Sequence, residues 1–560
     1  MIKKLTRRAS AAVDPFGWLS ATMDVAKKAA TNPVGVATAT AKYGLQLATL
    51  PLSAAWVSTG MEGLPLPEVK GDKRWSNPAW TQHPMYNAWL RYWVATGEYV
   101  DDLIAAGGDP DEFNVRKARQ FARIVLDMSA PCNNPFTNPD VHVRSWETGG
   151  KSLMKGFSHF LDDVIRRDGK PLRVDEGAFT VGENMAASKG KVIYRNELIE
   201  VMQYEPLTEK VHATPLLMVP PWINKYYIMD LNPGRSLVEW AGKQGRTVFM
   251  ISYRNPDESM ADTSFADYMT QGVLAALDVV QGVTEQDRID LLCVCLGGAM
   301  ATITAAYMSA TGDDRIGNIT LINTLLDYSE TGDLGLMSDP ETVYKIDTLM
   351  EAKGYLEGKN LATSFDLLRA HDLIYSYWIT RWMLGEDPPA FDLLVWNEDS
   401  TNMPRKMHGE YLRSLYNNNE LANGTLEMAG QRLGLDLVKN DVYIIGAIND
   451  HIVPWESSYA GVPLLGGDVR YVRASGGHIA GIVNPPSKKA WTEVLGDPTE
   501  ASQMPATSAE WLAKAERKAI SWWQDWAEWS KARAGELIDP PVMGGGKYEP
   551  MDDAPGTYVF

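Results

Sequence analysis

The sequence predicts an α/β fold in which helices cover both faces of a parallel β-sheet. Beyond about Thr180, short apolar and β-branched runs alternate with segments of helical periodicity, and such alternation is typical of successive βαβ units. Of the 560 residues, 45% are hydrophobic and 22% are charged, as in globular proteins with a sizeable core. This composition excludes intrinsic disorder over most of the chain.

The region before the alternating part is predicted to be mainly helical. From about residue 77 to 172, apolar residues such as Tyr86, Leu90 and Val94 recur at helical spacing, which is the pattern of one buried helix face. The run CNNPFTNP at 132–139 is dense in Asn and Pro and indicates a loop.

Residues 34–57 form the most apolar long stretch. It contains Lys42, Gln46 and Pro51, which make it too polar for the roughly 20 residues that cross a bilayer, so we predict no transmembrane segment. We interpret the stretch as a packed amphipathic helix, and contact with a hydrophobic surface is the alternative. The first ten residues, MIKKLTRRAS, are basic, but no clean apolar run follows, so we expect no signal peptide.

Six strands and three intervening helices are predicted in the second part of the chain. The strands are Pro215–Val219, Thr247–Ser252, Ile289–Cys295, Asn318–Asn323, Asp441–Gly446 and Asp468–Ala474, and the helices are Pro233–Gly245, Ser264–Gln281 and Gly298–Ser309. The interval between the strands near 320 and 441 is too long for one crossover. We therefore expect a mainly helical domain over 1–185 and an α/β domain over 186–560, with an inserted helical lid at about 330–430.

Charge and cysteine content restrict the possible functions. The net charge is −18, from 53 Lys and Arg against 71 Asp and Glu. An acidic surface repels phosphate backbones, which argues against nucleic-acid binding. Only three cysteines occur, Cys132, Cys293 and Cys295. They cannot form a disulfide framework, which indicates a reducing, cytoplasmic environment.

Cys295 is the candidate nucleophile. It ends a predicted strand and precedes Leu296-Gly297-Gly298 and an alanine-rich helical run, the strand–turn–helix context of a nucleophile elbow. Small residues allow a turn tight enough to hold the nucleophile clear of the sheet. A strand-end cysteine is by default a small buried hydrophobe, but the glycine pair favours the elbow. Cys293 lacks that context.

Asp450 and His478 are the candidate partners of this thiol. Each lies four residues beyond a predicted strand, in AINDHIVPW and ASGGHIAG. The order Cys295, Asp450, His478 is the order of an α/β-hydrolase triad, which predicts that fold. His451 is the rival base, but it precedes any later strand that could return it to the site, so we interpret it as supporting or structural.

An oxyanion hole is expected from two backbone amides. One is the amide of Leu296, directly after the nucleophile. The other would come from the loop after the strand ending at Val219, where Ile223 follows two prolines. In the alternative interpretation, these prolines merely end the strand.

Ten motifs resemble those of one family, the polyhydroxyalkanoate synthases, also called poly(3-hydroxyalkanoate) polymerases. The similarity runs from about residue 71 to the C-terminus and includes GDKRWSNPAW (71–80), SAPCNNPFTNPDV (129–141), ETGGKSL (147–153), VGENMA (181–186), PLLMVPPWINKYYIMDL (215–231), SYRNPDESM (252–260), FDLLVWNEDSTNMP (391–404), DHIVPWESSY (450–459), SGGHIAGIVNPP (475–486) and PGTYV (555–559). The chain length resembles the single-subunit class I type. Family members usually have Gly at the position of Cys293.

The resemblance implies a Cys-His-Asp triad of Cys295, His478 and Asp450. It also implies that (R)-3-hydroxyacyl-CoA, such as 3-hydroxybutyryl-CoA, is polymerised through an acyl-cysteine intermediate with release of coenzyme A. No cofactor and no metal are expected, because coenzyme A is a leaving group. The implied partners are the substrate, the growing polyester chain, a second copy in a homodimer and the surface of a polymer granule.

Tryptophans stand out in two segments of the chain. Trp396 in the insertion is expected to anchor the lid or adjoin the entrance. Trp522, Trp526 and Trp529 share one helix face, which we interpret as a C-terminal helix docked on the body, with a polymer contact as the alternative.

Two functions compete with that of a polymerase. One is a thioesterase or polyester depolymerase with the same elbow, and the other is an inactive granule-coating protein.

Overall fold

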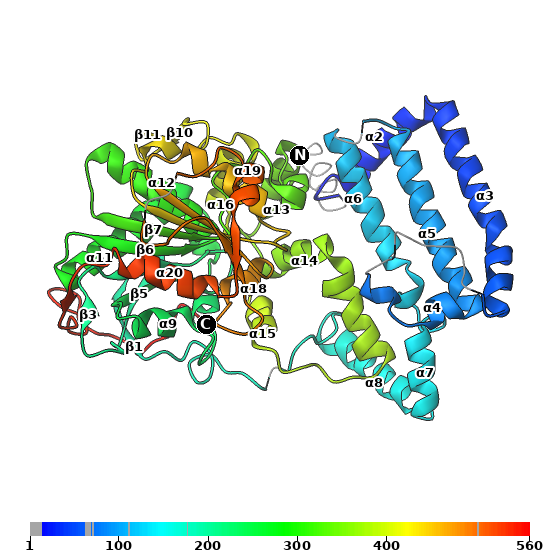
Figure 1. The fold of residues 1–560 in the computed structure, drawn as a ribbon, viewed down its shortest axis with the longest axis horizontal. Helices are drawn as coiled ribbons and strands as arrows, with labels where there is room; N and C mark the ends of the chain where they lie inside the picture. Colours follow the sequence, from blue (N-terminus) through cyan, green and yellow to red (C-terminus); the bar gives the residue numbers. More distant parts are fainter. Residues whose placement is uncertain (1–13, 62–68, 70–71, 110–111, 176, 501–502) are drawn as a thin grey trace. The chain divides into compact units, whose positions relative to one another are not determined.

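The computed structural model describes residues 14–61, 69, 72–109, 112–175, 177–500 and 503–560, in two compact units (Figure 1). The helical unit comprises Met1–Asp175 with Ala362–Ala390, and the sheet unit comprises Glu176–Leu361 with Phe391–Phe560. The first ten residues, to which the signal-peptide expectation refers, lie outside the described ranges.

The helical unit contains the helices expected between 77 and 172. Its helices are α2 (Trp18–Ala30), α3 (Pro33–Ser58), α4 (Ala79–Gln82), α5 (Pro84–Ala105), α6 (Phe113–Met128), α7 (Pro139–Glu147) and α8 (Lys151–Arg166). Residues Trp378–Met383 form a π-helix that packs on α8. Arg381 there makes a buried ion pair with Asp163 of α8 at 2.6 Å.

This ion pair attaches residues 362–390 to the N-terminal helices, so the two units differ from the domains that we predicted. We expected 330–430 to be one insertion, but 362–390 belongs with the N-terminal helices. Gly156 of α8 lies so close to the backbone of Trp382 that a Cβ would meet its carbonyl oxygen at 2.1 Å. The first unit also ends at Asp175, ten residues before the boundary that we predicted.

Helix α3 covers the apolar stretch 34–57 and packs along α5, as expected of a packed helix, but its outer face is apolar rather than polar. Only Ala39, Ser53 and Val57 are buried, while Val34 and Leu45 are 75% and 71% exposed. Within the described ranges, no helix combines the length and apolarity needed to cross a bilayer.

The sheet unit is built on ten strands in the order β1-β2-β5-β4-β6-β7-β12-β13-β14-β15. They are β1 (Gly190–Arg195), β2 (Ile199–Tyr204), β4 (Leu216–Val219), β5 (Val248–Tyr253), β6 (Ile289–Val294), β7 (Ile316–Ile322), β12 (Val442–Ala447), β13 (Val469–Ala474), β14 (Thr492–Val494) and β15 (Glu516–Lys518). All six predicted strands are confirmed and form the parallel centre. The sheet is mixed, because the outer strands pair antiparallel.

Each central strand divides its side chains between two cores. In β4, Leu217 and Val219 pack with α11 and α12 on one face, whereas Leu216 and Met218 pack with α9 and α20 on the other. This alternation follows from the two-residue period of a strand, and burial on both faces explains its continuous apolar sequence.

The remaining α-helices connect or cover the strands, except that the residues of α14 from Ala362 onward belong to the helical unit. They are α9 (Leu237–Lys243), α10 (Phe265–Asp267), α11 (Ala275–Thr284), α12 (Leu296–Thr311), α13 (Pro340–Met350), α14 (Gly358–Leu368), α15 (Asp392–Glu398), α16 (Arg405–Tyr411), α17 (Trp455–Ala460), α18 (His478–Ile482), α19 (Ser508–Lys514) and α20 (Trp522–Lys531). Three pairs of short strands lie outside the main sheet: β3 (Val211–His212) with β16 (Leu537–Ile538), β8 (Tyr355–Leu356) with β9 (Met403–Pro404), and β10 (Leu426–Met428) with β11 (Gln431–Leu433).

Candidate active site

Cys295 lies in the sharp turn between β6 and α12. Its φ of 51° and ψ of −119° are outside the regions that non-glycine residues ordinarily occupy, as expected of a strained nucleophile elbow. Its amide donates to the carbonyl of Ile322 at 2.9 Å, so the turn remains attached to the neighbouring strand β7. The residue is half-buried, whereas the other two cysteines are buried.

The two glycines after the elbow allow two close approaches. A Cβ on Gly297 would lie 2.4 Å from the carbonyl oxygen of Val219, and a Cβ on Gly298 would lie 2.2 Å from Oγ1 of Thr324. The start of α12 therefore sits directly against the end of β4 and the segment after β7. Any larger residue would push the elbow out of this position.

Asp450 and His478 meet at the same edge of the sheet. Asp450 follows β12 and His478 begins α18, after β13, and Nδ1 of His478 lies 2.6 Å from Oδ2 of Asp450. The other carboxylate oxygen of Asp450 accepts from the amides of Ile452 and Val453, both at 2.8 Å. Both oxygens are occupied, and the side chain has no exposed surface.

The imidazole of His478 links this carboxylate to the thiol. Burial disfavours its charged form, but the Asp450 carboxylate, followed by a hydrogen bond with Cys295 and the charge of its sulfur, raises the pKa of His478 well above its ordinary value. An imidazole held in this way can take the proton of a thiol and stabilise the thiolate. The structure thus brings Cys295, His478 and Asp450 together.

The other two thiols lack such partners. Burial raises the pKa of Cys293 far above its ordinary value and that of Cys132 to about 12. Both side chains therefore remain protonated at neutral pH, and thiols in this state are poor nucleophiles.

One predicted oxyanion donor belongs to the elbow, and the other lies in the loop that begins beside it. Leu296 is the first residue of α12, and an amide at this position has no intrahelical acceptor. Ile223 is half-buried in the loop after β4. This loop begins beside the elbow, because a Cβ on Gly297 would lie 2.5 Å from the carbonyl oxygen of Pro220.

The two predicted supporting residues lie in different surroundings. Trp396 of α15 is buried and donates its indole N–H to the carbonyl of Lys225 at 2.7 Å, so it anchors segment 391–404 to the loop after β4. His451 is half-buried beside Asp450, and it is His478 whose ring bonds the Asp450 carboxylate.

Three tyrosines near Cys295 were not predicted from the sequence. Burial is the main reason why the pKa values of Tyr328, Tyr411 and Tyr416 are raised, and charge on Cys295 adds to each shift. The Tyr416 ring lies 4.9 Å from that of Tyr328 and 5.6 Å from that of Tyr411, between ring centroids. Residues Leu412–Asn417 form a π-helix, a distortion frequent at functional sites, but the sequence carries no signal for it.

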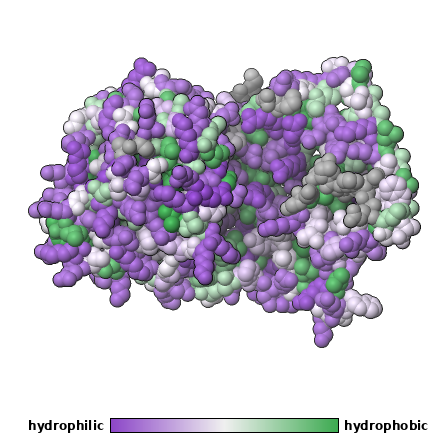
Figure 2. Space-filling model, in the orientation of Figure 1, coloured by the Kyte–Doolittle hydropathy of each residue, from purple (hydrophilic) through white to green (hydrophobic). Residues whose placement is uncertain are grey.

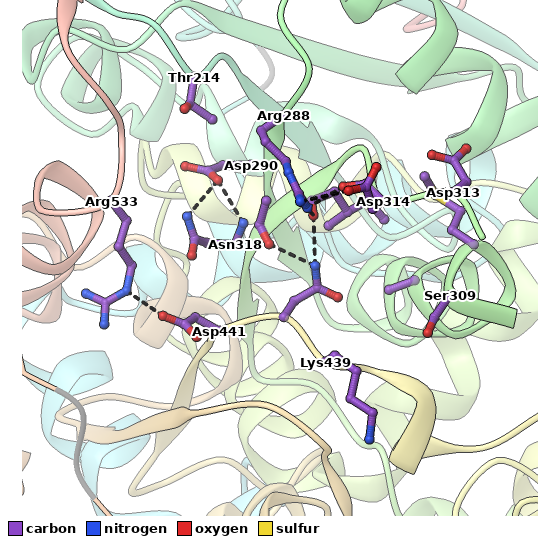
Figure 3. A pocket seen from close by; sticks show the side chains of 15 residues that line it. Thr214, Arg288, Asp290, Ser309, Asp313, Asp314, Asn318, Lys439, Asp441 and Arg533 are labelled. Atoms are coloured by element: carbon purple, nitrogen blue, oxygen red, sulfur yellow. Dashed lines mark hydrogen bonds and ion pairs between the residues drawn. The ribbon is translucent and has the colours of Figure 1, made fainter. Parts of the chain in front are cut away.

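A polar pocket lies at the opposite edge of the sheet, near the amino ends of β6, β7 and β12 (Figure 3). Its charges are largely paired, as in Arg288 with Asp314 at 2.9 Å and Arg533 with Asp441 at 3.0 Å. None of the predicted site residues lines it.

Two family models match the chain. Residues 71–241 match the N-terminal region of poly-beta-hydroxybutyrate polymerase (PhaC), and residues 215–485 match the alpha/beta hydrolase fold. The predicted α/β-hydrolase fold is thereby confirmed, with a helical N-terminal region added to it.

Curated relatives are similar over most of the chain. A poly(3-hydroxyalkanoate) polymerase of Methylorubrum extorquens is 38% identical over 517 residues, which span 90% of this chain and 84% of the relative. The poly(3-hydroxyalkanoate) polymerase subunit PhaC of Cupriavidus necator is 38% identical over 87% of this chain and 83% of its own. The subunit of Rhizobium meliloti is 36% identical over 88% and 80%.

Proposed function

The chain belongs to the poly(3-hydroxyalkanoate) polymerase family of acyl-transferring enzymes, and we propose that it polymerises (R)-3-hydroxyacyl-CoA with release of coenzyme A. The observation that carries this proposal is the series of contacts from Asp450 through His478 to Cys295 at the carboxyl edge of the sheet. We expect a short-chain substrate such as 3-hydroxybutyryl-CoA, as in class I enzymes.

The first step loads an acyl group onto the enzyme. His478 takes the proton of the Cys295 thiol, and the thiolate attacks the thioester carbonyl. As the tetrahedral intermediate collapses, the bond to coenzyme A breaks, and its sulfur leaves with the proton from His478. One thioester replaces another, so the acyl group remains reactive. No cofactor is consumed, because coenzyme A enters with the substrate.

The second step forms the ester. His478 takes the proton of a 3-hydroxyl group, the oxygen attacks the thioester carbonyl of another acyl unit, and the departing sulfur recovers the proton. We propose that Asp450 only orients His478. Its two carboxylate oxygens already accept three hydrogen bonds, and the side chain has no exposed surface for a substrate hydroxyl.

The surroundings of the elbow fit this chemistry. The Leu296 and Ile223 amides are proposed to hold the oxyanion of the tetrahedral intermediate. Segment 391–404, anchored by Trp396, is proposed to limit the entry of water, which would otherwise hydrolyse the acyl-enzyme.

An exposed apolar surface in the helical unit supports association with a polymer granule. Helix α8 buries Ser152, Gly156 and Asp163 and leaves its apolar face exposed. This α8 face comprises Leu153, Met154, Phe157, Phe160, Leu161, Val164 and Ile165. Apolar side chains are visible on this unit in Figure 2, and such helices bind apolar interfaces. Homodimerisation and a cytoplasmic location stay predictions from the resemblance and the composition.

A hydrolase is the competing function for this fold. Water would attack the same acyl-cysteine, release the free acid and regenerate the thiol, whereas a coat protein would form no acyl-cysteine. Purified protein incubated with 3-hydroxybutyryl-CoA is expected to release free coenzyme A thiol and to form insoluble polyester in matching amounts. Thiol release without polymer would indicate a hydrolase, and no release would indicate an inactive coat protein. Either outcome contradicts the proposal.

A further inference from the structure

Two residues at the end of β7 connect the nucleophile turn with the histidine loop. Strand β7 lies in the sheet between β6, which leads to Cys295, and β12, which leads to Asp450. Asn323 and Thr324 directly follow this strand and are both buried. Neither belongs to the triad or to the proposed oxyanion hole.

Asn323 is bound to the neighbouring strand β12 and to the segment that carries His478. Its amide donates to the carbonyl of Ile445 on β12 at 2.9 Å, and its side-chain nitrogen donates to the carbonyl of His478 at 2.6 Å. A carbonyl can only accept, so the side chain must present its nitrogen there. The side-chain oxygen is buried without a hydrogen-bond partner among the described residues, an unfavourable arrangement that the contact with His478 offsets.

The backbone of Asn323 also favours its residue type. Its φ is +47°, in the left-handed region where Asn is better tolerated than most other non-glycine residues. A glycine would suit this backbone equally well but would not reach His478. The substitution Asn323→Gly therefore removes the side-chain amide while it keeps the backbone conformation.

Thr324 holds the other side of the site. Its hydroxyl oxygen lies 3.2 Å from the carbonyl oxygens of Cys295 and Ile322 and can donate its one proton to either of them. Its side chain fills the space beside Gly298, and thus restrains the elbow from the same strand end.

We propose that Asn323 is a positioning residue, whose side chain holds the main chain of His478 so that the imidazole stays aligned with the sulfur of Cys295. The inference rests on the proposed function of these two residues. His478 begins a helix of only five residues, α18, which is too short to fix its own orientation. The opposite end of α18 is held by the indole of Trp522, bonded to the Gly481 carbonyl, so Asn323 supplies the restraint at the catalytic end.

The test measures activation of Cys295 without requiring turnover. Full-length protein is treated with iodoacetamide between pH 6 and 9, and alkylation of Cys295 is followed by mass spectrometry. Asn323→Gly keeps the backbone conformation and removes the donor. Because a displacement of about 1 Å can cost about 100-fold in rate, we expect alkylation at pH 7 to slow about tenfold and kcat to fall about 10- to 100-fold, with KM changed less than about twofold.

Two further variants show whether slower alkylation comes from the lost hydrogen-bond donor, from the lost side-chain volume or from a loosened strand β7. Asn323→Asp keeps the side-chain volume but cannot donate, so it should slow alkylation as Asn323→Gly does, and it decides the question if the glycine variant does not fold. Asn440 is the matched control, because its side chain donates to the carbonyls of Ile316 and Gly317 at the other end of β7. Asn440→Ala should leave alkylation unchanged.

Each outcome has a separate meaning. Alkylation and kcat that stay at wild-type values in both Asn323 variants would overturn the positioning role alone. An equal loss in Asn440→Ala would attribute the effect to general loosening of β7 and would also overturn it. If Cys295 of the wild type reacts no faster than a simple alkyl thiol, the proposed function fails, and the inference fails with it.

Discussion

The indole nitrogen of Trp522 donates a hydrogen bond of 2.7 Å to the carbonyl oxygen of Gly481. Helix α20 is thus bonded to the short helix that begins with His478. Trp522, Trp523, Trp526 and Trp529 are all buried, so the Trp-rich segment is a docked helix, as we interpreted it.

Trp522→Phe is expected to lower both stability and activity. Loss of one buried donor costs about 1–3 kcal/mol of unfolding free energy, and the released end of α18 should lower kcat. Trp526→Phe is the control, because its indole donates to Thr320 on β7 at 2.9 Å and not to α18. Urea unfolding should show similar losses for both variants, and an equal effect on kcat would refute the link to His478.

The nucleophile assignment predicts different effects at two neighbouring cysteines. Cys295→Ala should abolish coenzyme A release, because no thiolate remains to accept the acyl group. Cys293→Ala should retain it, since Cys293 is a buried packing residue of β6. Free thiol is measured with a colorimetric reagent. An active Cys295→Ala variant together with an inactive Cys293→Ala variant would place the nucleophile at Cys293 instead.

The raised pKa of His478 predicts a pH-dependent contribution to stability. Because the folded-state pKa lies above the ordinary value of 6.5, the contribution is fully present below about pH 6.5 and is lost as the pH rises through the folded-state pKa. In Asp450→Asn the larger of the two influences that raise this pKa is removed, and only that of Cys295 remains. The difference in urea midpoint between wild type and variant should therefore be largest near pH 6 and should narrow at higher pH. A widening difference would contradict the assigned ion pair.

Gly298→Ala should destabilise the elbow, because its Cβ would lie 2.2 Å from Oγ1 of Thr324. We expect an overpacking cost of about 1–3 kcal/mol. Thr324→Ala in the same chain should recover part of this loss, which a double-mutant cycle measures as coupling. Gly44→Ala in α3 is the control, since a Cβ there meets nothing within 4 Å. Purely additive effects at Gly298 and Thr324 would show that the two residues do not compete for space.

The α8 face is predicted to bind polyester. Replacing Met154, Phe157 and Ile165 together by Ser should reduce the fraction of enzyme that sediments with preformed polymer, because exposed apolar area drives this adsorption. Initial coenzyme A release from soluble substrate should not change. A Lys151→Ser/Arg166→Ser variant of the same helix should sediment as wild type does. Unaltered sedimentation of the triple variant would exclude this face as the contact.

Much of the site could be predicted because it depends on local sequence and chain order. The parallel strands are continuous apolar runs, and each candidate residue of the triad follows one of them. The four outer strands were missed since charged residues interrupt their patterns. Glu200 in β2 is buried against Arg195, and Glu493 in β14 against Arg473 and Arg517.

Other features depend on contacts between distant segments. No sequence pattern indicates that Arg381 pairs with Asp163 across 218 residues, and this pair attaches 362–390 to the helical unit. Likewise, Asn323 has the appearance of an ordinary strand-end residue until its side chain is seen beside the His478 carbonyl. Such long-range polar contacts carry no periodicity from which they could be predicted.

The hydrogen bonds on both carboxylate oxygens of Asp450 have a consequence for the timing of the proposed reaction. With that group engaged on both oxygens, one imidazole would serve the proposed loading and extension of the chain in turn. The two proposed half-reactions at one elbow would then not overlap, because the ring would have to return its proton to a departing sulfur before it could accept the next one. Under the proposed mechanism, polymer growth at each site would alternate strictly, with one coenzyme A released before each new ester bond begins to form.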